Sequence, residues 1–346
     1  MRVGLVLGAG GVVGASWLIG ALEALEEHTG WRAGEADRIV GTSAGSVIGA
    51  FAAAGVPASL MAAYADGRAL DEIAAAELDP VALARLLGDD GERILGSEYR
   101  LHRALPPFGP GSWRLAVESL RHPRRHSPTV AMAGWLPRGF ISTASIQALV
   151  DRFIGADWPE HPSYWAVAAD YATGRRVPFG REGAPKAVIA AAVAASCAIP
   201  GFYHPVTIAG RRYVDGGICS PSNLDLLRDE GLDLVLCFNP MSSLAQAAGG
   251  SPSDRLAALL RVGNGRRLGR EARKLRERGT RVVIFQPGAE EVELMGMNLM
   301  NPARRLEVMD FARRSVERDL HRLRTQPLLL PPKRRRPARP AMRRAA

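Results

Sequence analysis

The sequence predicts an α/β protein, a three-layer α/β/α sandwich around a mainly parallel central sheet. The first observation is a set of short, continuous apolar runs, such as residues 3–7 and 234–238, which are typical of parallel strands buried on both faces. The second is that these runs alternate with segments of helical periodicity. Strands that alternate with helices build a parallel sheet with helices on both sides, and this gives the fold class.

The N-terminal part repeats one unit, a strand followed by a glycine-containing turn and a helix. Residues 3–7 end in glycines and precede a helix predicted at residues 15–27. A second strand, residues 37–40, runs into another such turn and then into residues 46–54. Because residues 46–54 are small and apolar, we expect a helix packed tightly in the core.

Farther along the chain the alternation continues less regularly. Strands at residues 164–170 and 175–179 are expected to be adjacent because Ala172-Thr173-Gly174 forms a turn between them. A helix at residues 186–195 precedes a strand at 211–214. The remaining predicted elements are strands at residues 234–238 and 282–285 and helices at residues 253–278 and 302–323.

The chain is predicted to form one domain, residues 1–330, followed by a tail. With 346 residues it is long enough to bury a large core. Residues 57–138 break the alternation with prolines and interleave tryptophans with arginines, and we interpret them as a cap or insertion. Residues 331–346 are basic and contain no acid, which predicts a disordered tail.

The positive charge is concentrated in that tail. Seven of the charges behind the net +10 lie in residues 333–344, leaving +3 for the rest. The 42 arginines against three lysines accompany a richness in Ala, Gly and Pro, so they are a compositional bias. No aromatic pattern or folded module accompanies the tail, so we expect no nucleic-acid partner. Contact with an anionic membrane surface and simple solvation remain as alternatives.

Cysteine usage and hydropathy indicate a cytoplasmic protein, with peripheral membrane contact as an alternative. Cys197, Cys219 and Cys237 are an odd number without CxxC or Cys/His spacing, so neither a disulfide framework nor a zinc site is expected. The first residues carry too little basic charge and too short an apolar run for a signal peptide. No segment approaches the roughly 20 apolar residues that span a bilayer.

Ser43 is the candidate nucleophile. Gly41-Thr42-Ser43-Ala44-Gly45 fits G-x-S-x-G, the sharp turn between strand and helix in which the glycines remove side chains that would clash. A bare match is equally well explained as the start of a small-residue helix. Its place after a predicted strand and before a predicted helix favours the nucleophile.

A second glycine-rich segment runs from Gly8 to Gly14. Consecutive backbone N–H groups at a helix N-terminus bind anions, which suits either a dinucleotide or the oxyanion of a tetrahedral intermediate. The spacing is G-x-G-x-x-x-G, and the second strand ends at Ser43 where a ribose-binding acid would be needed. We therefore favour an oxyanion hole.

Asp215 is the third candidate. It lies at a predicted strand end, in Tyr213-Val214-Asp215-Gly216-Gly217, where the glycines let the backbone turn and leave room beside the carboxylate. Taken alone, an Asp before two glycines is more often a turn residue. Its occurrence with the two preceding motifs favours a catalytic carboxylate.

Together the three motifs resemble the patatin-like phospholipase family, which has a glycine-rich oxyanion loop, then G-x-S-x-G, then a distant D-G-[GA]. Residues 195–202 are similar to the family's A-S-x-A-x-P-x-x-F stretch. The resemblance covers residues 3–236, except about 60–138, where no motif matches. One departure lies in the loop, where the family's G-G-G-x-[RK]-G has a basic residue and this chain has Val13.

The resemblance implies a metal- and cofactor-free carboxylic ester hydrolase of lipid catabolism, acting on lipid acyl esters in the manner of a phospholipase A or lysophospholipase. It implies that Ser43 attacks, that Asp215 is its base and that the Gly10, Gly11 and Val12 amides bind the oxyanion. The remaining motif residues that it implies are Gly8, Gly14, Gly41, Gly45, Gly216 and Gly217.

Two other functions are compatible with parts of the sequence. A Ser-Asp-His α/β-hydrolase would place its histidine after the acid, whereas His204 precedes Asp215 and is interpreted as structural. The second hypothesis is a weak or inactive protein of the same fold that binds lipid surfaces or acts as a scaffold, motivated by Val13 and the basic tail. Ser43 and Asp215 together favour the enzyme. The sequence indicates neither the preferred ester nor the oligomeric state.

Overall fold

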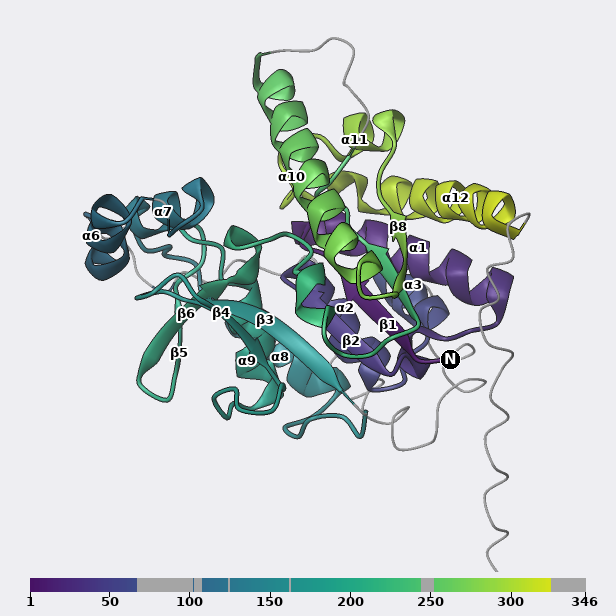
Figure 1. Cartoon of the computed structure of the whole chain (residues 1–346), viewed down its shortest axis with the longest axis horizontal. Coiled ribbons are helices and arrows are strands. Elements are labelled where there is room, and N and C mark those ends of the chain that lie inside the picture. Colours follow the sequence, from purple (N-terminus) through teal and green to yellow (C-terminus); the bar gives the residue numbers. More distant parts are fainter. Residues whose placement is uncertain (67–101, 103–107, 124, 162, 244–251, 325–346) are drawn as a thin grey trace, which may run out of the picture.

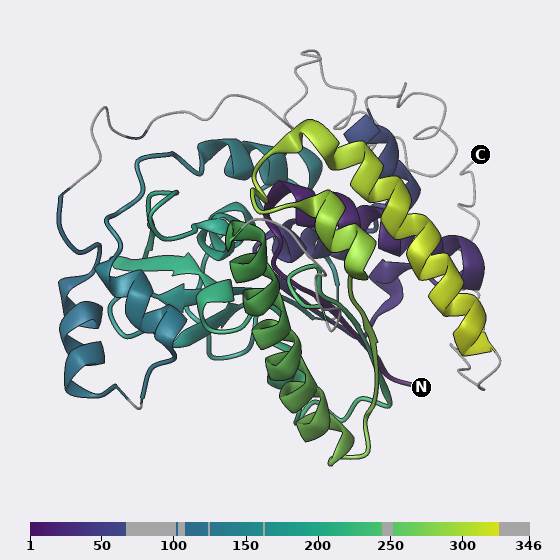
Figure 2. The same ribbon diagram turned by 90° about the horizontal axis from the view of Figure 1, so that it is seen from above.

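The chain folds around one mixed sheet of eight strands. A computed structural model describes residues 1–66, 102, 108–123, 125–161, 163–243 and 252–324. The strand order is β5-β6-β3-β2-β1-β7-β8, and β4 pairs with β3 outside this path. Helices cover both faces of the sheet (Figure 1; Figure 2 from above), which is the three-layer arrangement that the sequence predicts.

The sheet has a parallel half and an antiparallel half. The parallel strands are β1 (Val3–Leu7), β2 (Arg38–Thr42), β3 (Tyr164–Asp170), β7 (Leu234–Phe238) and β8 (Arg281–Phe285). The antiparallel strands are β4 (Arg176–Phe179), β5 (Val206–Ile208) and β6 (Arg211–Asp215). The strand β5 was not predicted from the sequence because it is only three residues long.

Alternate side chains of β1 show how the two helical layers pack. Leu5 and Leu7 are fully buried in the larger cluster, together with the helices α1, α2, α3, α8, α9 and α12. Val6 points to the other face, into a smaller cluster that includes Leu268 and Leu275 of α10. The helices of the first layer are α1 (Gly11–Thr29), α2 (Ala44–Ala53), α3 (Ala58–Asp66), α8 (Ala144–Phe153), α9 (Ile189–Cys197) and α12 (Arg305–Arg324), and α10 spans Pro252–Arg276.

Two helices, α6 (Trp113–Arg121) and α7 (Pro128–Trp135), pack on each other and stand away from the main body (Figure 1). Residues 58–66, the first part of the expected cap, instead lie in the main core as α3. Most of the rest of that cap, residues 67–101 and 103–107, lies outside the described residues, as does the basic tail. The remaining short helices are α11 (Ala289–Met295) and the 3-10 turns η1 (Ala33–Glu35), η2 (Gly216–Ile218), η3 (Leu224–Leu227) and η4 (Pro302–Arg304).

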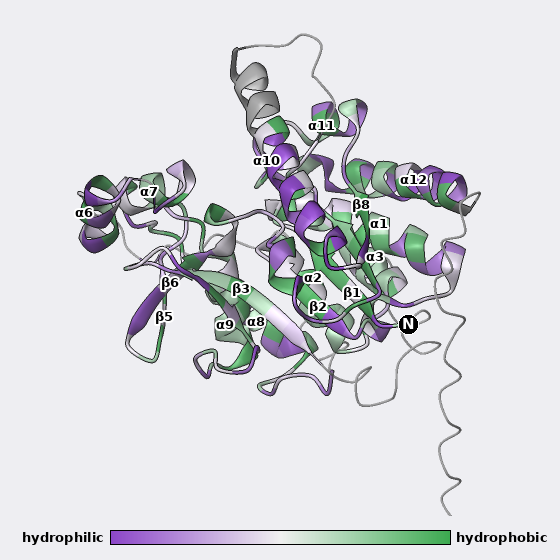
Figure 3. Cartoon of the chain, viewed as in Figure 1, coloured by the Kyte–Doolittle hydropathy of each residue, from purple (hydrophilic) through white to green (hydrophobic). Residues whose placement is uncertain are grey.

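Hydrophobic residues concentrate in the strands at the centre of the sheet, whereas α10 and α12 carry many hydrophilic residues (Figure 3). Within the described part of the chain, no helix combines the length and the apolarity that a membrane crossing requires. The three cysteines are buried and free.

Candidate active site

The register of the sheet explains why Ser43 and Asp215 meet although 172 positions separate them. The strand β2 runs parallel to β3 and ends with Thr42 opposite Val167. The strand β6 runs antiparallel to β3 and ends with Asp215 opposite Ala168, the next residue. Because β4 occupies the other edge of β3, β2 and β6 share one edge and approach each other with their C-terminal ends. Ser43 comes directly after β2 and Asp215 is the last residue of β6, so both lie at the point where the two strand ends meet.

Ser43 occupies a strained turn between β2 and α2. Its backbone has φ 54° and ψ −124°, a conformation that residues other than glycine rarely adopt and that a nucleophile elbow requires. A Cβ at Gly45 would overlap the carbonyl group of Leu7, and a Cβ at Gly41 would overlap the backbone of Gly45 and Ser46. The turn therefore needs glycine at both flanking positions because backbones approach each other there.

The elbow is held by a buried hydroxyl. Ser196 Oγ, at the end of α9, accepts a hydrogen bond from the Ser43 N–H at 3.0 Å and donates one to Val167 O at 2.6 Å. The Ser43 carbonyl accepts from Ser46 Oγ at 2.7 Å. These bonds connect the strained turn to the middle of β3.

Asp215 is buried beside the serine. Its residue surface is 5% exposed, and the Gly217 N–H donates to Oδ1 at 2.7 Å. Burial raises the pKa of Asp215 from 3.8 to about 6, while the Ser43 hydroxyl and the Gly217 N–H, as hydrogen-bond donors, pull the pKa back. A carboxylate with this pKa is ionised at neutral pH and is a better base than an exposed one.

The glycine loop precedes α1 and leaves three amides available. The Gly8 and Ala9 N–H groups donate to Phe238 O and Pro221 O at 2.8 Å, and the Val13 N–H donates to Leu299 O at 3.0 Å. Among the described residues, no acceptor is found for the N–H groups of Gly10, Gly11 and Val12. The backbone of Gly11 has φ +61°, which suits glycine.

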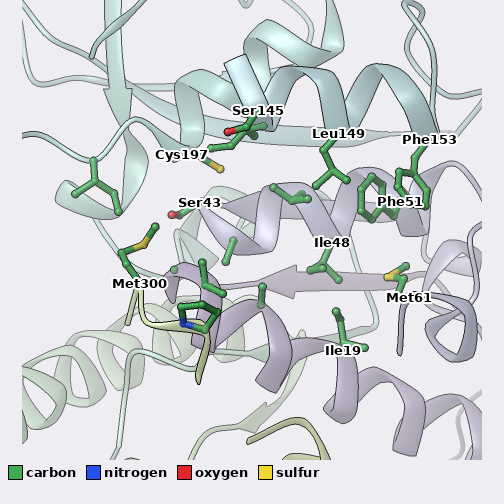
Figure 4. Close-up of a pocket in the computed structure, with 18 of the residues that line it drawn as sticks. Ile19, Ser43, Ile48, Phe51, Met61, Ser145, Leu149, Phe153, Cys197 and Met300 are labelled. Atoms are coloured by element: carbon green, nitrogen blue, oxygen red, sulfur yellow. The ribbon is translucent and has the colours of Figure 1, made fainter. Parts of the chain in front are cut away.

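A cavity of about 180 Å³ opens beside Ser43. Gly11 and Val12 line it next to the serine, so the glycine loop and the hydroxyl face one space. From there it extends along α2 to the rings of Phe51 and Phe153, whose centroids are 4.8 Å apart (Figure 4). Apolar side chains supply most of the lining between these two ends, among them Ala15, Ile19, Val47, Ile48, Met61 and Leu149.

The chain is similar to known proteins in sequence and in fold. A sequence model described as patatin-like phospholipase matches residues 5–228. The chain belongs to the patatin-like phospholipase family. Its fold is similar to VipD from Legionella pneumophila, at 15% identity and a TM-score of 0.40, with 93% of this chain and 67% of VipD covered. The type III effector ExoU is similar at 18% identity and a TM-score of 0.35, with 93% of this chain and 53% of ExoU covered.

Membership of the patatin-like phospholipase family identifies the chain as a lipid hydrolase by class. The match includes the glycine loop, Ser43 and Asp215. Where the family has a basic residue in the loop, the Val13 side chain is 2% exposed and packs in the main core. Position 13 therefore adds a core contact and no charge to the site.

Several residues of the site carry no sequence signal. Leu299 accepts the Val13 N–H, and Met300 and Pro302 line the cavity, although all three lie beyond the match to the patatin-like family. Asn223 Nδ2 donates to Thr42 Oγ1 at 3.0 Å and to Ser220 O at 2.7 Å, which fixes the end of β2. Only the tertiary structure brings these residues to the site.

His204 has a structural setting. Its ring stacks on His102, with centroids 3.9 Å apart, and its backbone N–H donates to Ile141 O at 2.8 Å. It is absent from the described lining of the Ser43 cavity. This placement agrees with its interpretation as part of the fold.

Proposed function

We propose that this patatin-like protein hydrolyses lipid acyl esters by a Ser43–Asp215 dyad. The observation that carries the proposal is the buried Asp215 carboxylate beside the Ser43 hydroxyl, which lines an apolar cavity. A serine alone is a weak nucleophile and needs an adjacent base. The pKa of about 6 makes Asp215 a suitable base at neutral pH.

The reaction proceeds in two halves. Asp215 takes the Ser43 hydroxyl proton while Oγ attacks the ester carbonyl carbon, and the alcohol then leaves with that proton as an acyl-serine forms. Water attacks the acyl-serine and gives one proton to Asp215, which passes that proton to Ser43 Oγ as the bond to the acyl carbon breaks and the fatty acid is released. Each tetrahedral intermediate carries an oxyanion that accepts hydrogen bonds from the Gly10, Gly11 and Val12 amides. A well-placed donor of this kind contributes roughly 3 to 4 kcal/mol.

The first experiment compares wild type, Ser43→Ala and Asp215→Asn on p-nitrophenyl esters of graded chain length, with a fluorophosphonate label alongside. We expect turnover and labelling by the wild type, neither by Ser43→Ala, and little turnover by Asp215→Asn. A folded wild type that turns over no ester and is not labelled at Ser43 would contradict the dyad. It would instead support the alternative, a lipid-surface binding or scaffold protein.

The apolar cavity is proposed to hold the acyl chain. The helix α2 begins next to Ser43, and Phe51 is seven residues farther on, so the cavity follows the helix for about 10 Å. An acyl chain in this space would end against Phe51 and Phe153. The length of the cavity then limits the length of the chain.

A pair of substitutions tests the acyl subsite. Phe51→Leu removes part of the ring at the closed end, so we expect the preferred ester to become longer. Phe285→Leu is the matched control, because Phe285 stacks on Phe238 in another part of the core, with centroids 4.6 Å apart. An unchanged preference in Phe51→Leu, or the same change in Phe285→Leu, would argue against the subsite.

We also propose that α6 and α7 bring the enzyme to an anionic membrane surface. Trp113, Val117 and Leu120 lie at i, i+4 and i+7 on one exposed side of α6, with Trp113 64% and Leu120 66% exposed. The exposed basic residues Arg114 and Arg121 flank this stripe. Tryptophan and arginine suit the headgroup region, and apolar side chains enter the acyl boundary.

The exposed apolar side continues on α7. Met132 is 57% exposed and Trp135 is 43% exposed, and the Trp135 ring contacts that of Trp113 edge to face at 6.5 Å. Glu118, the acid of α6, lies 3.9 Å from Arg125, so its charge is partly compensated. Together the two helices offer exposed aromatic groups, and α6 adds basic groups with little opposing negative charge.

Co-sedimentation with phosphatidylglycerol-containing vesicles tests membrane binding. Leu120→Ser and Trp135→Ser should each weaken binding several-fold while leaving hydrolysis of a soluble short ester unchanged. Val188→Ser is the matched control, because Val188 is 59% exposed but precedes α9, near the other end of β3. Equal binding by all variants, or no preference for anionic over zwitterionic vesicles, would contradict this face.

A further inference from the structure

A cluster of metal-ligating side chains lies between α1 and α12, away from the candidate active site. His28 is in the last turn of α1, and Glu317 and His321 are one turn apart on α12. One ligand atom from each of the three lies within 4.8 Å of the other two. We propose that His28, Glu317 and His321 bind a divalent transition-metal ion, Zn²⁺ by preference, and so fasten α12 to α1.

The tautomer of His28 is the first argument. Its Nδ1 lies 3.2 Å from Ala24 O, and because a carbonyl oxygen only accepts, Nδ1 carries the proton. In a neutral ring, Nε2 then has no proton and carries a lone pair. A metal-binding histidine usually has this arrangement, with its other nitrogen donating to a backbone carbonyl or a carboxylate.

The contact between His28 and Glu317 is the second argument. Nε2 lies 3.3 Å from Glu317 Oε1, so a lone pair faces a carboxylate oxygen that can only accept. Such a contact is favourable only if a cation, either a proton or a metal ion, lies between the two atoms. Two ligands of a tetrahedral Zn²⁺ at 2.0–2.1 Å are about 3.4 Å apart, which fits the observed separation.

The third ligand distinguishes a metal from a proton. A proton needs one donor and one acceptor, whereas the His321 ring also stands against His28, with centroids 5.0 Å apart and an interplanar angle of 83°. Two imidazoles and one carboxylate suit zinc and neighbouring divalent metals. His321 is exposed, so its side chain can rotate inward, and solvent can supply the fourth ligand.

The position of the cluster gives it a structural role. The 19-residue helix α1 is about 28 Å long, with the glycine loop at its start and His28 at its end. The helix α12 lies beyond the residues matched by the family, and it also contacts α1 through Arg313 and Glu27 at 3.8 Å. A metal here would hold the C-terminal helix on the catalytic domain without touching the reacting groups.

The test uses the full-length protein, stripped with a chelator and titrated with Zn²⁺ at pH 7.5. Saturable binding of one ion with a rise in Tm is expected for the wild type, and Co²⁺ should give the absorption of a tetrahedral nitrogen and oxygen site. His321→Ala and Glu317→Gln should each weaken binding by more than about 100-fold, because even outer partners of metal ligands account for 10–100-fold. Hydrolysis of a short ester should not depend on Zn²⁺.

His122→Ala is the matched control. Glu118 of α6 and His122, the residue after α6, form a similar pair, 3.8 Å apart, but without a third ligand among the described residues. Its Zn²⁺ affinity should equal that of the wild type. Absence of saturable binding by the wild type, or site variants that bind as well as the wild type, would overturn the proposal.

Discussion

The variant Asp215→Asn is expected to lose ester hydrolysis and yet to be more stable than the wild type above pH 6. Burial raises the pKa of the Asp215 carboxyl from 3.8 to about 6. A carboxyl with a raised pKa stabilises the fold below about pH 4, and this contribution is lost as pH rises through about 6. The difference between the two pKa values corresponds to about 3 kcal/mol of unfolding free energy at neutral pH.

Asparagine removes the charge and keeps the shape. Its amide oxygen can still accept the Gly217 N–H, which lies 2.7 Å from the carboxylate in the wild type. We therefore expect a gain of about 1 to 3 kcal/mol at pH 7.5 and almost none at pH 4. Urea denaturation of both proteins at the two pH values measures the gain, and ester hydrolysis on the same samples measures the loss of activity.

Asp170→Asn provides the contrast. Asp170 is also buried, but its carboxylate accepts the Ala172 and Thr173 N–H groups at 2.9 Å and pairs with Arg211 at 2.7 Å. Loss of these charge-assisted bonds should destabilise the protein by about 1 to 3 kcal/mol. If Asp215→Asn is destabilised at pH 7.5 as Asp170→Asn is, or if its gain is independent of pH, the inference that burial raises the pKa of the Asp215 carboxyl is refuted.

Three further predictions concern the site and its frame. Below pH 6, kcat/KM should fall about tenfold per pH unit because protonated Asp215 cannot accept the serine proton, and a flat profile down to pH 4.5 would exclude it as the base. Ser196→Ala should lower kcat more than it changes KM and cost about 1 to 3 kcal/mol in urea unfolding, because two buried groups lose their partner. Gly45→Ala should prevent folding because the added Cβ overlaps the Leu7 carbonyl group. Gly263→Ala, on the open side of α10, should instead stabilise the protein by about 0.5 to 1 kcal/mol because alanine is the better helix former. Circular dichroism measures the folding of both variants.

The sequence predicts the parallel half of the fold well. Strands β1, β3 and β7 occur at the predicted residues because they are buried on both faces and read as continuous apolar runs. The first helix begins at Gly11 rather than at residue 15, because the positive φ of Gly11 lets the chain turn into the helix at once. Glycine-rich sequence conceals that early start, since glycine is a poor helix former.

The candidate site was predicted in its parts but not in its assembly. Ser43 and Asp215 can be predicted from local motifs. Leu299 and Met300 reach the site only because the chain folds back to the glycine loop after β8, and no local pattern indicates this. The same limit applies to His28 and His321, which lie in separate helices and lack any metal-binding spacing in the sequence. Both sites are assembled by contacts between segments that lie far apart in the sequence, and the residue types alone do not predict those contacts.

The meeting of β2 and β6 on one edge of β3 places the proposed base next to the proposed nucleophile. Each strand ends where the other ends, so a residue just past β2 and the last residue of β6 face each other across one position of β3. Neither side chain needs a long or flexible stem to reach the other, which suits the proposed pair of a serine and an aspartate. Asp215 is only 5% exposed at this junction, and its burial raises the pKa of the carboxyl. One strand register therefore accounts both for the placement of the proposed dyad and for the burial of its carboxyl.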